Sequence, residues 1–578
     1  MKQYYNQFFE KGQQVINFNF YNLGLSADDP VYTLINILED FDFSSLLARY
    51  SNKGRKGYNP IMLFAVLLYA NMRGIRAVDR IVELCERDIA FIWLTKGEKP
   101  QRDTFYAFLN EKLTKEILED LHYQFIRILE KKGLVTLKTL FIDGTKIEAN
   151  ANRYTFVWRG TVNYHLAGLL DTIDKLYLSY NKFLQSQNYH NAYDLPLEKM
   201  FVIEGIDKVK DIITKNRKRK SLNLEKISNN SIIEIGNISP LKLMELQANL
   251  SRIANAEKIL FVHGKRNRKS ELQKLYESLE EASTRLLKYK EHFKLMGTDR
   301  NSYSKTDIEA TFMRMKDDHM QNGQLKPAYN VQLAVENYFV IHTYISNDRT
   351  DYNTLIPVLE KHKAHFNSFP QEVTADSGYS SEPNLVYLKN NNIDSYIKLQ
   401  MHEKMKTRDY KKDIGKFYNM EKVITQDGVH FICKDGRKLQ YEHSEYRNKN
   451  GYRHNFEVYS CKNCSDCEFK PHCLYKYNEE KDIHKNKVMK INLLWETLKS
   501  ESNNNIQSEK GIFYRQIRSI QTEGHFGDIK ENDNFRRFNH RTSEKVYKEF
   551  LLYAVGRNLN KYYRFAKEKI KTYEAKTA

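Results

Sequence analysis

The chain has 578 residues, a length that predicts several domains and a sizeable hydrophobic core. Lys and Arg number 92 against 73 Asp and Glu, which gives a formal net charge of +19, and 41% of the residues are hydrophobic, which excludes an intrinsically disordered protein. The surplus of positive charge favours an anionic partner such as nucleic acid, although a Lys-, Asn-, Ile- and Tyr-rich composition produces the same surplus without that function.

Signals for membrane insertion or export are missing from the sequence. The longest apolar stretch, residues 61–70, covers half of the ~20 residues that a membrane-spanning helix needs. The first residues do not contain the apolar region or the cleavage site of a signal peptide. The six cysteines, four of them in one short cluster, do not form the framework of a secreted disulfide-rich protein. We therefore expect a cytoplasmic protein.

Residues 30–130 are predicted to form consecutive helices. Asn followed by Pro at residues 59–60 is typical of a helix N-terminus and begins an apolar run that ends at Met72. A second helix is predicted at residues 77–85, and Asp103 is predicted to cap a third. Short helices joined by tight turns are typical of a helix-turn-helix module, but a plain helical bundle has the same pattern.

The middle of the chain contains a predicted helical hairpin. In residues 246–260 and 272–286, mostly apolar residues recur at alternating intervals of three and four positions. This spacing places them on one face of a helix and predicts two antiparallel helices that pack through these faces. The segment between them, residues 264–269, is basic, and so is the run at residues 215–220. Each basic run either contacts DNA or is simply solvated.

A mixed β-sheet is predicted on both sides of this hairpin. We predict strands at residues 140–144, 329–335, 339–345, 372–376 and 395–398, and helices at residues 352–365, 382–390, 513–530 and 543–571. Without the two insertions, three antiparallel strands precede alternating helices and strands. This order predicts a mixed sheet.

Three carboxylates stand at notable places in this pattern. Asp143 ends the first strand, Asp376 ends the fourth strand, and Glu523 lies on the last core helix. If the fourth strand lies beside the first, the three side chains converge, and oxygen-only ligation of this kind selects Mg²⁺ or Mn²⁺. Two such ions can activate a water or a 3′-hydroxyl group and stabilise the leaving oxygen of a phosphodiester. Each residue alone also fits an ordinary turn or a solvated helix position.

Several segments resemble bacterial insertion-sequence transposases of the DDE superfamily, which have an RNase H-like catalytic fold. They are FIDGTK at residues 141–146, TADSGY at 374–379 and RSIQTEGHFGDIK at 518–530, together with residues 311–316, 326–332, 535–538 and 559–561. The resemblance covers most of residues 30–565. It implies an RNase H-like core, with a five-stranded mixed sheet, that is preceded by a helical N-terminal domain.

The resemblance also implies roles for individual residues. Asp143, Asp376 and Glu523 would form the catalytic triad and bind Mg²⁺ or Mn²⁺. Basic residues expected to contact DNA are Lys146, Arg314, Lys316, Arg518, Lys530, Arg536 and Arg537. Many relatives place an arginine four residues before the glutamate, whereas Arg518 precedes Glu523 by five. Carboxylates ranked below the triad are Glu148, Asp307, Glu309 and Asp528.

The expected domain organisation follows from these segments. Residues 1–132 form the helical DNA-binding domain, and residues 133–159, 298–399 and 511–571 form the catalytic core. Residues 160–297 form a helical, coiled-coil insertion, and residues 400–510 form an insertion with a cysteine cluster.

The cysteine cluster predicts a metal site. Cys461, Cys464, Cys467 and Cys473 supply four soft ligands within thirteen residues, and tetrahedral Zn²⁺ is the commonest ion for that set. An iron–sulfur cluster is the alternative, and His472 is a substitute for one thiol. Cys85 and Cys433 are expected to be buried or inert.

The sequence therefore predicts a transposase that cleaves the ends of its element and joins the 3′-hydroxyl groups to target DNA. Its expected partners are the terminal inverted repeats, the target DNA and at least one further copy of itself, and DNA binding would associate it with the nucleoid. An RNase H-like nuclease without strand transfer and a non-catalytic DNA-binding repressor are the alternatives. No G-x-x-x-x-G-K-[ST] motif is present, so ATP-driven chemistry is not expected.

Overall fold

The computed structural model describes residues 25–51, 57–197, 239–264, 266–297, 300–315, 323–426, 428–449 and 451–568. These residues divide into two compact units. The first contains residues up to Ile147, Asn330–Ser346 and the chain from Thr350 onward, and the second contains Glu148–Tyr329 and Asn347–Arg349. Mixed α/β structure with a helical N-terminal region confirms the predicted fold class.

The N-terminal part of the first unit is helical, as predicted. Its helices are α2 (Pro30–Glu39), α3 (Ser44–Leu47), α4 (Pro60–Met72), α5 (Val78–Arg87), α6 (Ile89–Thr95), α7 (Arg102–Ala107), the π-helical turn η2 (Phe108–Lys112) and α8 (Lys115–Lys131). The Asn59 side chain accepts hydrogen bonds from the backbone N–H groups at the start of α4, which confirms the predicted helix start. The prediction that Asp103 caps a helix is wrong, because Gln101 is the N-cap of α7 and Asp103 lies in its first turn.

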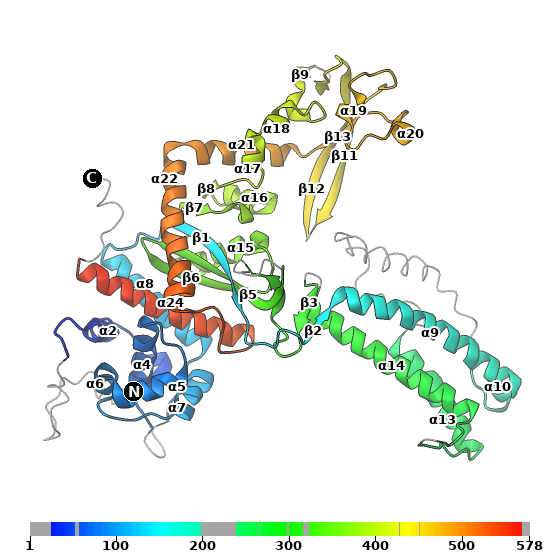
Figure 1. Cartoon of the computed structure of the whole chain (residues 1–578), viewed down its shortest axis with the longest axis horizontal. Coiled ribbons are helices and arrows are strands. Elements are labelled where there is room, and N and C mark those ends of the chain that lie inside the picture. The colour runs from blue at the N-terminus through cyan, green and yellow to red at the C-terminus, as the bar shows by residue number, and fades with distance from the viewer. Residues whose placement is uncertain are drawn as a thin grey trace. The chain divides into compact units, whose positions relative to one another are not determined.

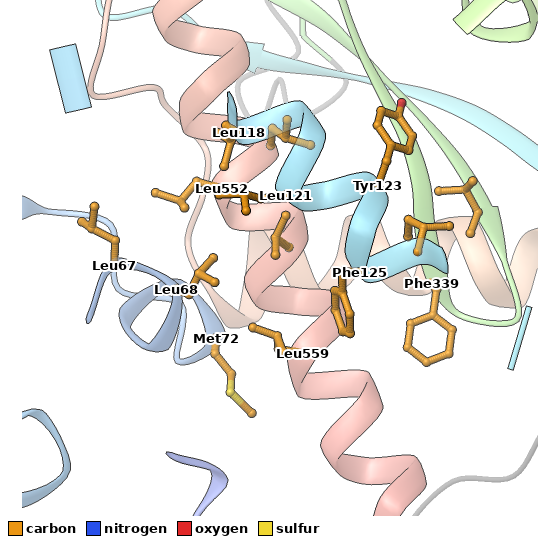
Figure 2. Close-up of a cluster of buried hydrophobic side chains, with 14 of the residues drawn as sticks. Leu67, Leu68, Met72, Leu118, Leu121, Tyr123, Phe125, Phe339, Leu552 and Leu559 are labelled. Carbon is orange, nitrogen blue, oxygen red and sulfur yellow. The ribbon is translucent and has the colours of Figure 1, made fainter. Parts of the chain in front are cut away.

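Helix α4 is buried on every side. All of its residues are buried, and it packs against α24 (Ser543–Ala566), the last described helix. Figure 2 shows Leu67 and Leu68 of α4 close to the leucines of α8 and α24. A helix buried in this way cannot lie in a DNA groove, so α4 is not a recognition helix. The N-terminal helices share one hydrophobic core with α24 and with the central sheet.

A mixed sheet forms the centre of the first unit (Figure 1). Its strands are β1 (Thr139–Glu148), β5 (Leu325–Glu336), β6 (Phe339–Ser346), β7 (Glu372–Ala375) and β8 (Asp394–Ile397). Antiparallel β6 pairs with β5, β5 lies beside β1, and β1, β7 and β8 are parallel. The first and fourth predicted strands are therefore neighbours, as expected.

Helices and short turns connect these strands. They are the 3₁₀ turns η4 (Asp351–Asn353) and η5 (Ser377–Tyr379), and the helices α15 (Leu355–Phe366) and α16 (Glu382–Asn390). A sixth strand that the sequence did not predict, β4 (Thr311–Arg314), pairs with the first residues of β5 in the second unit.

The Cys-rich region contains more regular structure than the sequence predicted. A five-stranded antiparallel sheet is formed by β9 (Glu421–Thr425), β10 (Gly428–Ile432), β11 (Lys438–Lys449), β12 (Tyr452–Cys461) and β13 (Val488–Ile491). Short helical segments accompany it: α17 (His402–Lys406), α18 (Arg408–Lys412), η6 (Phe417–Asn419), α19 (Lys470–Cys473) and α20 (Glu479–Asp482). Much of this sheet is exposed, so its strands do not show a clear apolar alternation.

The chain then returns to the central sheet through four consecutive helical segments. These are α21 (Leu493–Gln507), α22 (Glu509–Arg518), the π-helical turn η7 (Ser519–Glu523) and α23 (Gly524–Gly527), followed by a second π-helical turn, η8 (Asp528–Asn532). The sequence predicted one helix over residues 513–530 and missed α21.

The second unit is built around the predicted helical hairpin. Helices α13 (Pro240–Ala256) and α14 (Glu271–Met296) pack against each other and against α9 (Arg159–Ser186), with α10 (Tyr189–Ala192) and the strand pair β2 (Phe156–Trp158) and β3 (Ser302–Ser304). Leu260 was predicted to lie on the hairpin seam, but α13 ends before it and its side chain is 87% exposed. The basic run at residues 215–220 lies outside the described residues. Within the described ranges, no helix has the length and apolarity needed to cross a bilayer.

Close approach of α24 to α4 depends on a glycine. A Cβ atom at Gly556 would lie 2.7 Å from the backbone of Asn71 and Met72. We expect Gly556→Ala to push the two helices apart and to lower the free energy of unfolding by about 1–3 kcal/mol, as overpacking does. Urea and thermal unfolding of the full chain measure this change.

The matched control is Gly168→Ala in α9, where an added Cβ meets nothing within 4 Å. Because alanine favours the helix by about 1 kcal/mol over glycine, this variant should be as stable as the parent chain or slightly more stable. Equal unfolding of Gly556→Ala and the parent chain would contradict the close packing of α24 on α4.

Candidate active site

Asp143 and Asp376 lie side by side on neighbouring parallel strands. The last residues that pair between β1 and β7 are Ile142 and Ala375, so the two aspartates come next on strands about 4.8 Å apart. Asp143 is 7% exposed. The prediction that the first strand ends at Asp143 is wrong, because β1 continues to Glu148. Only the pairing of β1 with β7 ends just before Asp143.

Each aspartate is fixed by a backbone N–H that follows it in the chain, within β1 for Asp143 and within the turn η5 for Asp376. Asp143 Oδ1 accepts a hydrogen bond of 2.8 Å from the N–H of Gly144. Asp376 Oδ1 accepts one of 2.7 Å from the N–H of Gly378 and caps the turn η5. Both carboxylates are therefore held in defined orientations before any ligand binds.

The helix that carries Glu523 contacts Asp143 directly. Arg518 Nη1 lies 2.7 Å from Asp143 Oδ2, and Arg518 Nη2 lies 3.9 Å from Glu523 Oε1. The Thr522 hydroxyl also donates to Asp143 Oδ2, at 3.3 Å. One guanidinium group thus lies between two of the three predicted triad residues, while the Glu523 side chain is 62% exposed.

The π-helical turn η7 explains the unusual spacing of Arg518 and Glu523. In an α-helix, residues four apart share a face, but the i→i+5 hydrogen bonds of a π-helix align residues that are five apart. Because η7 covers Ser519–Glu523, it accommodates the additional residue and keeps Glu523 on the face of Arg518. The departure from the spacing of the family therefore leaves the contact with Asp143 intact.

A further carboxylate that the sequence analysis missed lies next to the two aspartates. Asp351, in η4, is close to Gly144 in β1 and to Gly378 in η5, the turn after β7. Burial raises the pKa of the Tyr379 hydroxyl well above its usual value, and the negative charges of Asp351, Asp143 and Asp376 raise it further. The negative charges of all three carboxylates therefore act on the Tyr379 hydroxyl.

The lower-ranked carboxylates have structural partners of their own. In the second unit, Glu148 pairs with Arg153 at 2.8 Å, and Asp307 accepts hydrogen bonds from the Tyr329 hydroxyl. Glu309 lies in the same unit.

Asp528 connects the helical segment of Glu523 to α24. Its carboxylate pairs with Arg557 and, at 3.4 Å, with Lys561. Burial raises the pKa of Asp528, but the positive charges of Arg557 and Lys561 outweigh burial, so its pKa lies below the usual value. Asp528 therefore serves the packing of these helices.

The donor chemistry of the site fits a hard divalent cation. Asp143, Asp376 and Glu523 offer only carboxylate oxygens, the ligands that Mg²⁺ and Mn²⁺ prefer. As their side chains are placed, no three His, Cys, Asp or Glu residues in the described part of the chain are close enough together to hold a metal ion. Arg518 occupies the space between Asp143 and Glu523 and supplies positive charge there.

The cysteine cluster contains one more thiol than the sequence predicted. Cys461, Cys464, Cys467 and Cys473 line a cavity of about 20 Å³, and Cys433 lines it too. Cys433 directly follows β10, and the turn to β11 brings it to the other four. All of these thiols are free. The signal missed in the sequence is the hairpin itself, because β10 and β11 were not predicted.

Two protein-family models match the chain. One, described as Transposase DDE domain, matches residues 432–563, and the other, described as Transposase domain (DUF772), matches residues 20–111. These two matches indicate a DDE-type transposase of an insertion-sequence family. No curated protein and no solved structure matches it.

The match to the Transposase DDE domain includes Glu523 but begins after both aspartates in the chain. Asp143 and Asp376 lie upstream of residues 432–563. Their assignment in this transposase therefore rests on the strand pairing and on the contacts of Arg518 and Thr522.

The basic residues predicted to contact DNA are in different environments. Lys146 lies on β1, Arg314 is exposed at the end of β4 in the second unit, and Lys316 lies outside the described residues. Lys530 is only 9% exposed.

The other two lie between η8 and α24. Arg536 pairs with Glu531 at 2.7 Å, and Arg537 is exposed. Together with the Asp143 contact of Arg518, these positions single out Arg537 and Arg314 as the predicted residues most open to solvent.

Proposed function

We propose that this transposase binds the ends of its element, cleaves phosphodiester bonds there and transfers the 3′-hydroxyl ends to target DNA by a two-metal mechanism. The observation that carries the proposal is that Asp143 and Asp376 follow paired residues of neighbouring parallel strands, while Arg518 lies between Asp143 and Glu523, in a chain that matches a DDE transposase domain. The family match supports a transposase; the individual steps are our inference.

The side chains of the site have distinct roles in this proposal. Asp143, Asp376 and Glu523 hold the divalent cations, which when bound activate the attacking hydroxyl group and stabilise the leaving oxygen. Arg518 fixes Asp143 and partly neutralises the site before cations and DNA arrive. Because a guanidinium group also binds phosphate oxygens, Arg518 is placed to contact the DNA backbone next to the carboxylates.

The remaining features of the proposal follow from this chemistry. The partners are duplex DNA with terminal inverted repeats, target DNA and a second copy of the chain, because two ends must be held together. Backbone contacts are assigned to Lys146, Arg314, Lys316, Arg518, Lys530, Arg536 and Arg537. We also propose that the protein is cytoplasmic and associates with the nucleoid when it binds DNA. Its proposed domains are the helical N-terminal domain, the catalytic core, the helical insertion and the Cys-rich insertion.

The first test removes charge from the triad. Asp143→Asn, Asp376→Asn and Glu523→Gln should each abolish Mg²⁺- or Mn²⁺-dependent cleavage of duplex DNA that carries the flanks of the coding frame. Because the three residues act as one unit, double variants should be hardly worse than single ones. DNA binding should persist, since loss of negative charge does not weaken attraction to phosphates. Gel assays of cleavage, strand joining and binding measure these effects.

The control for the triad is Asp394→Asn, which makes the same change at an exposed position at the start of β8. It should cleave like the parent chain. Asp528→Asn is less suitable, because it breaks the ion pairs with Arg557 and Lys561. Full cleavage by any triad variant would remove that residue from the site, and cleavage without strand joining would indicate a nuclease instead of a transposase.

We also propose that Cys461, Cys464, Cys467 and Cys473 hold one structural Zn²⁺. Their common cavity supports this proposal, although the thiols would have to move closer together to bind the ion, and a Cys₄ site leaves no open position for chemistry. The backbone N–H of Lys487 points to Cys464 Sγ at 3.5 Å, an arrangement that suits a metal-bound thiolate. Zn²⁺ would connect the end of β12 to α19 and so stabilise the Cys-rich region.

Elemental analysis of the purified chain tests the zinc site. We expect one zinc per chain in the parent protein and in Cys85→Ser, whose thiol lies in α5, and none in Cys464→Ser. Cys433→Ser should keep zinc if the four predicted cysteines suffice. Iron with a visible absorption band would indicate an iron–sulfur cluster, and a metal-free parent chain would exclude both.

A further inference from the structure

The carboxylate of Asp351 lies close to the residues that follow the candidate catalytic aspartates, Gly144 in β1 and Gly378 in the turn η5. A Cβ atom built on Gly144 would be 2.8 Å from Asp351 Oδ1. A Cβ atom built on Gly378 would be 3.1 Å from Asp351 Oδ2 and 2.9 Å from Asp376 Oδ1. Glycine at these two positions therefore leaves room for the carboxylate of Asp351. Asp351 Oδ2 and Asp376 Oδ1 therefore both lie close to the Cβ position of Gly378, and the distance between the two oxygens cannot exceed the sum of their distances to that position.

Two amide side chains of β5 fix the orientation of Asp351. Its Oδ1 accepts hydrogen bonds from Asn330 Nδ2 at 2.7 Å and from Gln332 Nε2 at 2.9 Å. The Tyr379 hydroxyl donates to Gln332 Oε1, which connects this network to the turn of Asp376. No residue in the described part of the chain donates a hydrogen bond to Oδ2. One oxygen of Asp351 is thus fixed, and the other remains available next to Asp376.

The charges around these residues are unbalanced. Arg518 pairs with Asp143, but within the described ranges no Lys, Arg or His side chain forms an ion pair with Asp351 or Asp376. Neighbouring carboxylates repel one another unless positive charge is supplied. The amides of Asn330 and Gln332 donate hydrogen bonds to Asp351 but carry no charge. A divalent cation at Asp376 would provide the missing charge.

We propose that Asp351 is a further acidic residue of the active site, whose Oδ2 helps to bind the divalent cation held by Asp376 and Asp143. This inference rests on the proposed function only in assuming that a divalent cation binds at the two aspartates. It assigns to Asn330 and Gln332 the role of positioning residues, which hold Oδ1 and thereby direct Oδ2 toward Asp376.

The test is Mn²⁺ binding to the purified full chain without DNA, measured by titration calorimetry, together with the Mg²⁺ concentration that gives half-maximal cleavage. In Asp351→Asn the side-chain oxygen can still accept from Asn330 and Gln332, so the variant removes charge but keeps the hydrogen bonds. We expect it to bind Mn²⁺ about tenfold more weakly or worse, a loss typical of a removed metal-site partner, and to need correspondingly more Mg²⁺. Asp394→Asn, the matched exposed control, should bind as the parent chain does.

A second pair of variants separates charge from folding. Asp351→Glu keeps the charge and should retain more Mn²⁺ affinity than Asp351→Gln, which has the same length without the charge. Circular dichroism shows whether each variant is folded. If Asp351→Asn does not fold, the difference in Mn²⁺ affinity between Asp351→Glu and Asp351→Gln shows whether the charge of Asp351 contributes to cation binding.

The outcomes distinguish the two proposals. Parent-like Mn²⁺ binding by Asp351→Asn, with binding lost in Asp376→Asn, would overturn the role of Asp351 and leave the proposed function in place. Equal binding by Asp351→Glu and Asp351→Gln would overturn it too. A parent chain that binds no Mn²⁺ would overturn the metal-dependent function and the role of Asp351 with it.

Discussion

The parallel pairing of β1 with β7 is the constraint on which the candidate active site depends. It places Asp143 beside Asp376 although the helical hairpin and the strands β2 to β6 lie between them in the sequence. A one-residue shift in the register would turn one aspartate to the opposite face of the sheet. The paired residues just before them, Ile142 and Ala375, are buried in the hydrophobic core, and this burial fixes the register.

Packing the carboxylates together creates an electrostatic problem that the structure solves only in part. Arg518 neutralises Asp143 and approaches Glu523, and the π-helical turn η7 keeps these groups on one face. Asp351 and Asp376 receive hydrogen bonds from amides and from the backbone, but no ion pair within the described residues. The side of the site near Asp376 therefore carries more uncompensated negative charge, and we expect a cation to bind there first.

The sequence was sufficient to predict five of the six strands that the structure describes in the central sheet, because these five have clear apolar patterns; β4 was missed. It was not sufficient to predict η7, since a π-helical turn depends on packing against the sheet and has no periodicity of its own. Asp351 was missed because it follows a loop that resembles an ordinary turn. Its signal was present elsewhere: Asn330 and Gln332 interrupt an apolar strand and are almost fully buried, and buried amides need polar partners.

If Asp143, Asp376 and Glu523 form the active site as proposed, the region matched as Transposase DDE domain does not contain the whole site. Residues 432–563 contain Glu523 but lack β1 and β7, and with them both aspartates. The helical segment of Glu523 is tied to α24 through the ion pair of Asp528 with Arg557, and α24 in turn packs closely on α4 at Gly556. The position of Glu523 therefore depends on how α24 packs against the N-terminal helices as well as on the matched region itself.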